Sequence, residues 1–429
     1  MSLSNKEVRW TLDRFPEEFE IRKYIFDTRR KVCQQFGYEE YLAPLVENAD
    51  IYRAKSWEDV WWTELTLLTD REGNVSDIAL RPEMTPSITR MITKRYTQMS
   101  KPIRYFSIAN FYRNERPQRG RNREFWQLNI DLFWANTISA DIEILQMWIE
   151  IMKAFNTPKD SRELYINHRK LIDYVLEQAS WLTAEQKVET VRTMDKWDKL
   201  SLEAFTEILT KKWLSSTQIT TITSYMQTQT LEDLVDHFPD IKDTIWYQET
   251  LQITKTLTAL WYAWLFTFKP SLIRGFDYYD AMVFEMFDKH PDNNRAMFGW
   301  WRYNGLAEIF GSEDIPAVWF APGDESMRLF LESRWLIDNF RAQHQYKDIY
   351  YLPLLNQWLV DQYKKIAQLL RGESKNVLEW LEEQKIWKAL RYADKNKIKY
   401  IIIFDEQEAQ ANQYKIKNLE TAKEEIFTL

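Results

Sequence analysis

The sequence predicts a mixed α/β protein with more than one domain. An α+β region with an antiparallel sheet and a helical insertion comes first, and a smaller α/β domain follows. Three observations carry this prediction: two strand-like segments around an arginine-rich loop, a glycine-free stretch with helical spacing over residues 171–262, and alternating strands and helices after residue 345. A chain of 429 residues is long enough for two or three domains of roughly 100–200 residues each.

The N-terminal region predicts a helix and then a short strand. Pro16 is well suited to the first turn of a helix, and Gly37 is typical of the position just past a helix end. Residues 37–44 then predict a short edge-like strand that ends in proline. The stripe expected to face the core is formed by Ile21, Ile25, Thr28 and Val32.

Residues 103–112 and 125–133 predict adjacent antiparallel strands, because both are rich in aromatic and β-branched residues. Side chains of a strand alternate between its two faces. One face of the second segment carries Trp126, Leu128, Ile130 and Leu132. The other face carries Gln127, Asn129 and Asp131. We therefore expect the first face to pack in the core and the second to form a polar site.

The loop between these strands, residues 113–123, is arginine-rich. Its arginines are Arg113, Arg116, Arg119, Arg121 and Arg123. Such a cluster is typical of a loop that binds phosphates. The alternative is a basic hairpin that simply lies in water. The polar side chains and the acid on the following strand make that alternative weaker.

Downstream, apolar residues recur at three- and four-residue spacings from about residue 171 to 262, which predicts an inserted helical subdomain. Strands resume near Leu272, and residues 327–333 predict a closing helix. After the polar residues 341–346, a strand–helix–strand pattern predicts a small domain with a mostly parallel sheet. Its lysines fit a nucleic-acid contact and an ordinary solvated face equally well: Lys385, Lys388, Lys395, Lys397 and Lys399.

Composition limits the environment and the kinds of site. A single cysteine, Cys33, excludes an internal disulfide and a multi-cysteine zinc site, and no metal site is predicted. The polar start has no signal-peptide pattern, and no apolar run reaches about 18 residues. We therefore expect a cytoplasmic protein without a membrane span. The net charge of −7 does not exclude a nucleic-acid ligand, because local basic patches determine where phosphates bind.

Several segments resemble the class II aminoacyl-tRNA synthetases. Arg113 with Glu115, followed by Arg121 shortly before Phe125, is similar to the second signature motif of that class. Four further segments narrow the resemblance to the histidyl-tRNA synthetase family: Leu80-Arg-Pro-Glu-Met-Thr85, Arg274-Gly-Phe-Asp-Tyr-Tyr279, Arg302-Tyr-Asn-Gly-Leu306 and Pro316-Ala-Val-Trp-Phe-Ala-Pro-Gly323. The resemblance runs from about Val8 to the C-terminus.

The resemblance implies a domain plan and partners. It implies a catalytic domain over residues 1–340, with the insertion at 171–262, and an anticodon-binding domain over residues 346–429. The helix and strand of the N-terminal region resemble the first motif of the class, which implies a homodimer through them. The implied partners are ATP, L-histidine and histidine tRNA. In this family an extra guanylate at the 5′ end of that tRNA is read near the positions of Gln118 and Arg119.

By resemblance, ATP and Mg²⁺ serve the reaction, and the second motif binds ATP. Arg113 would hold the α-phosphate, Glu115 the adenine amino group and Arg121 the γ-phosphate, while Phe125 would stack on the adenine. Activation joins a carboxylate to the α-phosphate and expels pyrophosphate, so positioned arginines and Mg²⁺ contribute mainly electrostatic stabilisation. The predicted catalytic residues are Arg113 and Arg274.

The histidine pocket that the resemblance implies contains Glu83, Thr85, Gln127, Asp131, Tyr279 and Tyr303. The first four would meet the α-amino group of the substrate. Tyr279 with Glu83 would orient the imidazole, and Tyr279 and Tyr303 would bound the pocket. Polar partners for both ring nitrogens discriminate better than an apolar pocket. The four histidines of the chain lie outside every motif, so no histidine general base is indicated.

Two positions leave alternatives open. The third motif of the family commonly has arginine where this chain has Ser326, and Arg328 two residues later is the substitute ATP ligand. On a helix that shift turns the side chain by about 200°. Arg274 has a structural alternative, which is an ion pair with Asp277.

These features predict ATP-dependent ligation of L-histidine to histidine tRNA through a histidyl-adenylate intermediate. The alternative is a non-catalytic, histidyl-synthetase-like regulatory subunit of histidine biosynthesis. Such a subunit normally lacks the C-terminal domain and has degraded ATP motifs. In this chain the C-terminal domain and the ATP motifs are both present.

Glycine is unusually rare in this chain, and tryptophan is common. There are 9 glycines and 20 tryptophans in 429 residues, whereas glycine usually makes up about 7% of a protein. The resembling family has glycine at five tryptophan positions: Trp10, Trp134, Trp300, Trp301 and Trp319. One hypothesis is that the source organism decodes the stop codon UGA as glycine, and that the printed sequence translates UGA as tryptophan. The alternatives are true tryptophan enrichment, or a degenerate protein whose ATP pocket is blocked by indoles.

Overall fold

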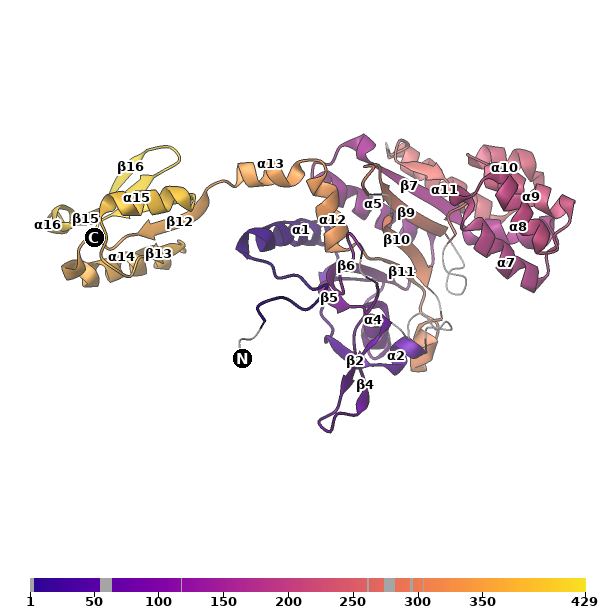
Figure 1. Ribbon diagram of the computed structural model, residues 1–429, viewed down its shortest axis with the longest axis horizontal. Helices are drawn as coiled ribbons and strands as arrows, with labels where there is room; N and C mark the ends of the chain where they lie inside the picture. The colour runs from indigo at the N-terminus through magenta and orange to yellow at the C-terminus, as the bar shows by residue number, and fades with distance from the viewer. Residues whose placement is uncertain are drawn as a thin grey trace. The chain divides into compact units, whose positions relative to one another are not determined.

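The computed structural model describes residues 4–54, 64–116, 118–260, 262–273, 282–293, 296–303 and 305–429, without the side chains of residues 300, 301 and 303. The chain divides into two compact units, Met1–Leu336 and Ile337–Leu429 (Figure 1). Each unit has its own sheet and its own buried core. No helix in the described part of the chain is long and apolar enough to cross a membrane.

An eight-stranded sheet forms the centre of the first unit, in the order β1-β5-β6-β11-β10-β9-β7-β8. The β1–β5 and β7–β8 pairs are parallel, and the other neighbours are antiparallel. The strands are β1 Glu39–Glu40, β5 Ile103–Tyr112, β6 Glu124–Phe133, β7 Arg162–His168, β8 Phe266–Phe268, β9 Met282–Asp288, β10 Ala296–Tyr303 and β11 Ala317–Phe320. The expected hairpin is confirmed, with Ile103 opposite Phe133 and Tyr112 opposite Glu124.

Helices cover both faces of this sheet. On one face lie α1 (Pro16–Gln35) and α5 (Ile138–Ala154). Phe26 of α1 contacts Trp126 at 5.4 Å between ring centroids, and Trp148 of α5 contacts Phe298 at 4.1 Å. On the other face lies α4 (Thr85–Thr93), whose apolar side packs against Ile103. The polar side chains of β6 lie on this second face. Further elements of this region are β2 Val46–Asn48, α2 Asp50–Arg53, β3 Thr66–Thr69, β4 Val75–Leu80 and α12 Asp324–Glu332.

The buried stripe of α1 differs from the predicted one at one position. Ile21, Ile25 and Val32 are buried as expected, but Arg29 is fully buried and Thr28 is not. A charged residue is normally expected to face solvent. Here the burial of Arg29 is possible because its guanidinium donates to the carbonyls of Pro322 and Gly323. The predicted edge strand is confirmed only as the two-residue β1.

The insertion is helical, as predicted. Its helices are α6 Arg169–Asp173, a π-helical turn over Tyr174–Ala179, α7 Ala184–Met194, α8 Leu202–Lys211, α9 Ser216–Gln227, α10 Leu231–His237 and α11 Ile245–Ala259, with 3₁₀ turns over Trp197–Lys199 and Pro239–Asp243. Hydroxyl side chains begin most of these helices by accepting a backbone N–H of the first turn. They belong to Thr183, Ser201, Ser215, Thr230 and Thr244. These caps satisfy donors that a helix leaves unpaired at its start.

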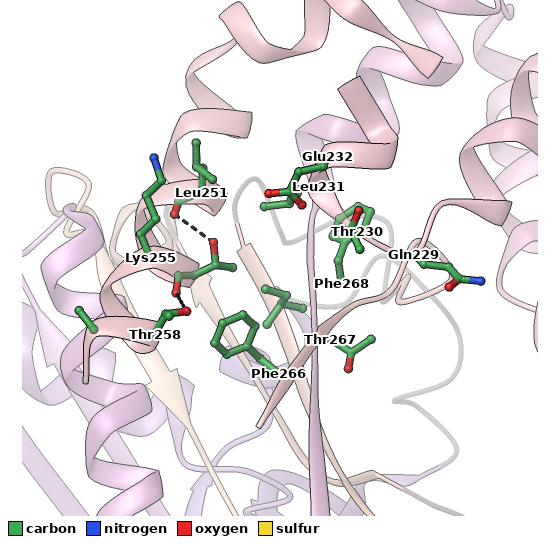
Figure 2. A pocket seen from close by; sticks show the side chains of 13 residues that line it. Gln229, Thr230, Leu231, Glu232, Leu251, Lys255, Thr258, Phe266, Thr267 and Phe268 are labelled. Atoms are coloured by element: carbon green, nitrogen blue, oxygen red, sulfur yellow. Dashed lines mark hydrogen bonds between the residues drawn. The ribbon is translucent and has the colours of Figure 1, made fainter. Parts of the chain in front are cut away.

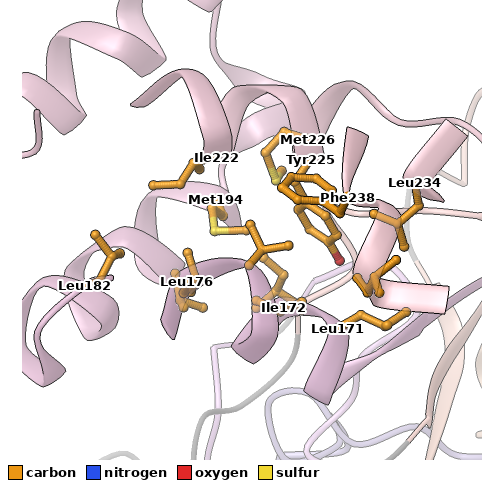
Figure 3. Close-up of a cluster of buried hydrophobic side chains, with 14 of the residues drawn as sticks. Leu171, Ile172, Leu176, Leu182, Met194, Ile222, Tyr225, Met226, Leu234 and Phe238 are labelled. Carbon is orange, nitrogen blue, oxygen red and sulfur yellow. The ribbon is translucent and has the colours of Figure 1, made fainter. Parts of the chain in front are cut away.

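A cavity of about 640 Å³ lies between α10, α11 and the edge strand β8 (Figure 2). Phe266, Leu251 and Lys255 are among the residues that line it, and none of the lining residues belongs to a predicted site. The insertion has its own apolar core, in which Tyr225 and Met226 meet Phe238 (Figure 3).

The second unit contains a five-stranded sheet in the order β13-β12-β14-β15-β16. Its elements are β12 Lys347–Leu352, α14 Val360–Gly372, β13 Val377–Glu379, α15 Ile386–Lys395, β14 Ile398–Ile403, α16 Glu406–Gln410, β15 Gln413–Asn418 and β16 Glu424–Thr428, and α13 Leu336–Gln343 precedes them. The first three strands of the sheet are parallel, but β15 and β16 are antiparallel. The sheet is therefore mixed and not mostly parallel, because the β14–β15 connection is too short for a crossover.

Cys33 provides a test of how firmly α1 packs. The thiol is fully buried, and burial raises its pKa to about 12. Only the thiolate reacts with disulfide reagents. We therefore expect Cys33 to resist 5,5′-dithiobis(2-nitrobenzoate) at pH 8 in the folded protein and to react fully in denaturant. A K211C variant, with its new thiol at an exposed position of α8, is the control and should react at once. Rapid labelling of Cys33 in the folded protein would contradict this packing.

Candidate functional site

The polar face of β6 is the floor of the candidate site. Asn129 and Asp131 are fully buried there, and Gln127 is half-buried. The Tyr41 hydroxyl donates to Asp131 Oδ2 at 3.3 Å. Burial raises the pKa of Tyr41 well above its usual value, and the Asp131 charge raises it further. This phenol therefore remains a donor at neutral pH, and it helps to hold the buried carboxylate.

Two further predicted residues lie beside this floor. Gln127 Nε2 donates to the carbonyl of Ala321 at 2.6 Å, which links β6 to the segment after β11. Thr85 begins α4 and is almost fully buried, and its hydroxyl has no hydrogen-bond partner in the described part of the chain. Buried hydroxyls are normally paired, so this one suits a polar ligand.

Arg113 lies just past the end of β5. Its Nε donates to the carbonyl of Pro82 at 2.9 Å, so the segment that carries Glu83 and Thr85 is fixed to the strand end. Its guanidinium carbon also lies 5.1 Å from the centre of the Phe125 ring. The structure thus brings Arg113, Phe125 and the Glu83–Thr85 segment together.

The tip of the arginine loop meets α12. Gly120 has a left-handed φ of 80°, and a Cβ there would lie 3.2 Å from the Leu329 side chain, which explains why the turn needs glycine. A cavity of about 380 Å³ lies at this junction. It is lined by Gln118, Arg119, Gly120, Arg121, Asp288, Asp292, Asn293, Ala296, Met297, Ser326 and Leu329. The two predicted tRNA-binding residues and Arg121 therefore share one hollow.

Several predicted ATP ligands are held by acids. Arg121 pairs with Glu115 at 3.1 Å. Arg328 pairs with Glu325 and with Glu332, both at 2.8 Å, along its own helix. Ser326 borders the cavity and Arg328 does not, as the helical rotation between the two positions requires.

Some predicted residues fall outside this description. Arg274, Asp277 and Tyr279 lie outside the described residues, and so does the Tyr303 side chain. The Tyr303 backbone pairs with Ala317 of β11.

Trp319 stands directly on the polar face. It lies opposite Asp131 in the β11–β6 pair, so the two side chains share one side of the sheet. Its indole is buried in the cluster that contains Ile88 and Ile92 of α4. A bulky ring therefore occupies space beside the buried carboxylate.

Three arginines that the sequence did not mark as important hold the start of α12. Arg29 donates to the carbonyls of Pro322 (3.2 Å) and Gly323 (3.0 Å). Arg22 pairs with Asp324 at 2.8 Å, and Arg14 pairs with Glu325 at 2.9 Å. The only signal in the sequence is the position of Arg29 on the apolar stripe of α1.

Arg81 belongs to one of the resembling segments but was assigned no role, and it holds the segment before α4. It donates to the carbonyl of Ala43 at 2.6 Å and to that of Asn110 at 2.9 Å. This residue is nearly fully buried, and it fixes the chain just before Glu83.

Comparison with known proteins gives the family. A model of the family described as histidyl-tRNA synthetase matches residues 11–323, and a model described as anticodon binding domain matches residues 348–429. The chain belongs to the histidyl-tRNA synthetase family. It is 32% identical to the histidine–tRNA ligase of Leptospira biflexa over 99% of this chain and 96% of that protein. It is 29% identical to that of Thermococcus kodakarensis over 97% and 95%.

Solved structures of histidyl-tRNA synthetases share this fold. The protein from Nostoc sp. PCC 7120 superposes with a TM-score of 0.80 at 19% identity, covering 100% of this chain and 97% of that chain. The apo enzyme from S. aureus gives 0.69 at 21% identity over 99% and 97%. The family and the fold class expected from the sequence are thereby confirmed.

Replacement of Arg29 should strongly lower the free energy of unfolding of this synthetase-family chain. We expect R29M to lower the free energy of unfolding by about 3 kcal/mol, because it leaves two buried carbonyls without their donor. The matched control is R30M on the same helix, whose side chain forms a partly exposed pair with Glu40. That change should cost about 1 kcal/mol or less. Urea unfolding of both variants measures the difference, and equal losses would show that Arg29 does not hold the α12 turn.

Proposed function

We propose that this chain ligates L-histidine to histidine tRNA with ATP, through a histidyl-adenylate. The observation that carries the proposal is the shared face of β6, where the motifs resembling the histidyl family converge: Arg113 and Phe125 lie at one end, and Gln127 and Asp131 lie along it. Relatives named histidine–tRNA ligase match almost the whole chain. We also propose residues 1–340 as the catalytic domain and residues 346–429 as the anticodon-binding domain.

The proposed ATP site uses the arginine loop. Arg113 would bind the α-phosphate while Phe125 stacks on the adenine ring. Glu115 and Arg121 pair with each other, so ATP that binds both must replace this ion pair with the adenine amino group and the γ-phosphate. The pair is partly exposed, so breaking it costs little in comparison with a phosphate–arginine contact. Arg328 would have to leave two glutamates, which makes it the weaker candidate.

Mg²⁺ would enter this site with the nucleotide. Within the described residues, no cluster of three or more histidine, cysteine, aspartate or glutamate side chains is placed to hold a metal ion. We propose that the ion is held through the ATP phosphates, where it offsets their charge. Arg274 is proposed as the second catalytic arginine.

Histidine recognition would use the buried polar face. Asp131 is a fully buried acid beside a tyrosine donor, which suits the α-ammonium group of an amino acid. The Thr85 hydroxyl, which has no hydrogen-bond partner among the described residues, and the Gln127 amide would complete that contact. Glu83, Tyr279 and Tyr303 are proposed to surround the imidazole. The regulatory-subunit alternative is not favoured, because the matched anticodon-binding region and the ATP motif are both present.

The decisive measurement is ATP–pyrophosphate exchange with each of the twenty amino acids. We expect exchange with histidine alone, since the pocket is proposed to pair polar groups with both ring nitrogens. The protein should be assayed as printed and with glycine at positions 10, 134, 300, 301 and 319. Activity only in the second form would show that the indoles block the site. Exchange with another amino acid, or with none in either form, would refute the proposal.

The proposed contact of Arg113 with the α-phosphate of ATP can be tested in the same exchange assay. R113A should lower histidine-dependent exchange at least about tenfold, because removal of a transition-state charge partner costs more than roughly 1.4 kcal/mol. R192A removes an equal charge from a surface pair in the insertion and serves as the control. Equal rates for the two variants would remove Arg113 from the reaction.

Deletion of residues 346–429 tests the separation of the two domains. The proposed catalytic arginines all precede the deletion, so histidine adenylation should persist while tRNA charging falls much further. Loss of phosphate contacts should also flatten the salt dependence of tRNA binding. Circular dichroism must first show that the truncated protein is folded. Equal loss of both reactions in a folded truncation would mean that the C-terminal domain supports the catalytic core.

We also propose a homodimer through α1 and the β1 region. Cyclic dimers are the commonest soluble oligomers, and the first motif of this class implies the same arrangement. Sedimentation velocity at micromolar concentration should give the mass of two chains. A monomer under these conditions would contradict the assignment.

A further inference from the structure

Five tryptophans have a left-handed backbone. Their φ angles are 71° at Trp10, 85° at Trp134, 52° at Trp181, 65° at Trp213 and 59° at Trp335. They account for half of the non-glycine residues with positive φ in the described part of the chain. Bulky side chains rarely adopt this conformation, whereas glycine adopts it without steric cost.

Trp213 occupies a helix end of the kind that glycine normally forms. After α8, the Trp213 N–H donates to the carbonyl of Thr210 at 3.1 Å, and the Leu214 N–H donates to that of Leu209 at 3.4 Å. This is the Schellman arrangement, in which the left-handed residue is usually glycine. The tryptophan therefore stands where the backbone favours glycine.

The same chain contains a glycine in the matching position of α1. The Gly37 N–H donates to Gln34 at 3.0 Å, the Tyr38 N–H donates to Cys33 at 3.1 Å, and the φ of Gly37 is 77°. Gly37 and Trp213 each lie two positions past the last residue of their helix. Two identical caps thus carry the smallest and the largest residue.

Three of these tryptophans have side chains that contribute little to offset the strained backbone. Trp181, Trp213 and Trp335 are 81%, 89% and 71% exposed. Within the described residues their indoles form no ring contact or hydrogen bond. An indole normally stabilises a protein through its large buried area. Trp197, by contrast, has no positive φ and packs edge-on against Phe205 at 4.7 Å.

We propose that the protein made in its source cell carries glycine at positions 10, 134, 181, 213 and 335, because UGA codons there are read as glycine. The assignment of glycine to positions 181, 213 and 335 rests on their backbone conformation and not on the family resemblance. The composition agrees, since glycine and tryptophan together make up about 7% of the chain, which is the usual share of glycine alone. The inference does not depend on the proposed function.

The first test reads the gene and the protein. We expect UGA at all five positions, and peptide mass spectrometry of the protein from its source cells should find glycine there. A UGG codon, or a tryptophan peptide, at position 181, 213 or 335 would overturn the proposal.

The second test measures the strain in recombinant protein. The triple variant W181G/W213G/W335G should raise Tm by about 3 °C or more, because relief of a left-handed tryptophan at each site outweighs the added freedom of the unfolded chain. W197G, which removes a packed indole, is the matched control and should lower Tm. The reciprocal change G37W should also lower Tm. An unchanged or lowered Tm for the triple variant would show that these backbones accept tryptophan.

Discussion

The buried guanidinium of Arg29 is the constraint on which the site depends. It donates hydrogen bonds to the carbonyls of Pro322 and Gly323, in the turn between β11 and α12, in place of hydrogen bonds to water. Burial lowers its pKa to about 10, so it remains charged at neutral pH. A buried charge is stable only when polar groups surround it, so the position of α1 and the path of this turn determine each other. Asp324 extends the link, because it pairs with Arg22 and accepts the Trp126 N–H of β6 at 3.2 Å.

The geometry of the cavity beside the arginine loop follows from this turn. Because the start of α12 is fixed, Ser326 and Leu329 are placed at the cavity that the arginine loop closes. The loop in turn reaches α12 only because Gly120 has no side chain to meet Leu329. Catalysis by charge stabilisation requires donors that are already in position. In the proposed function, Arg29, Arg22 and Arg14 would provide that order through the turn before α12. The helix α1 therefore helps to shape the candidate site through the turn before α12.

Local sequence rules predicted the parts of the fold that depend on short-range patterns. The hairpin, its polar face and the helical insertion follow from period-two and helical spacing, and the structure has all three. The place of Arg29 on the apolar stripe of α1 hinted at its burial, but its partners were not predictable, because they come from a turn almost 300 residues later in the chain. The mixed sheet of the second unit was missed for another reason. Strand–helix–strand spacing predicts parallel pairs, but the short α16 connection reverses the direction of β15. The placement of Arg121 against Glu115 likewise depends on the loop conformation and not on residue spacing.

The tryptophan positions are where local rules and the fold disagree most clearly. Elsewhere the chain is locally consistent: hydroxyl residues begin most helices of the insertion, and Gly37 ends α1. Functional sites often break such rules, but Trp181, Trp213 and Trp335 lie outside the candidate site and their side chains face solvent. A functional reason therefore does not explain them. With glycine at these positions, the backbone angles, the exposure and the composition of the chain all agree. If UGA were also decoded as glycine at position 319, the indole beside Asp131 on the polar face would be absent. Decoding of UGA as glycine would then both remove the backbone strain at the left-handed tryptophans and leave space beside Asp131.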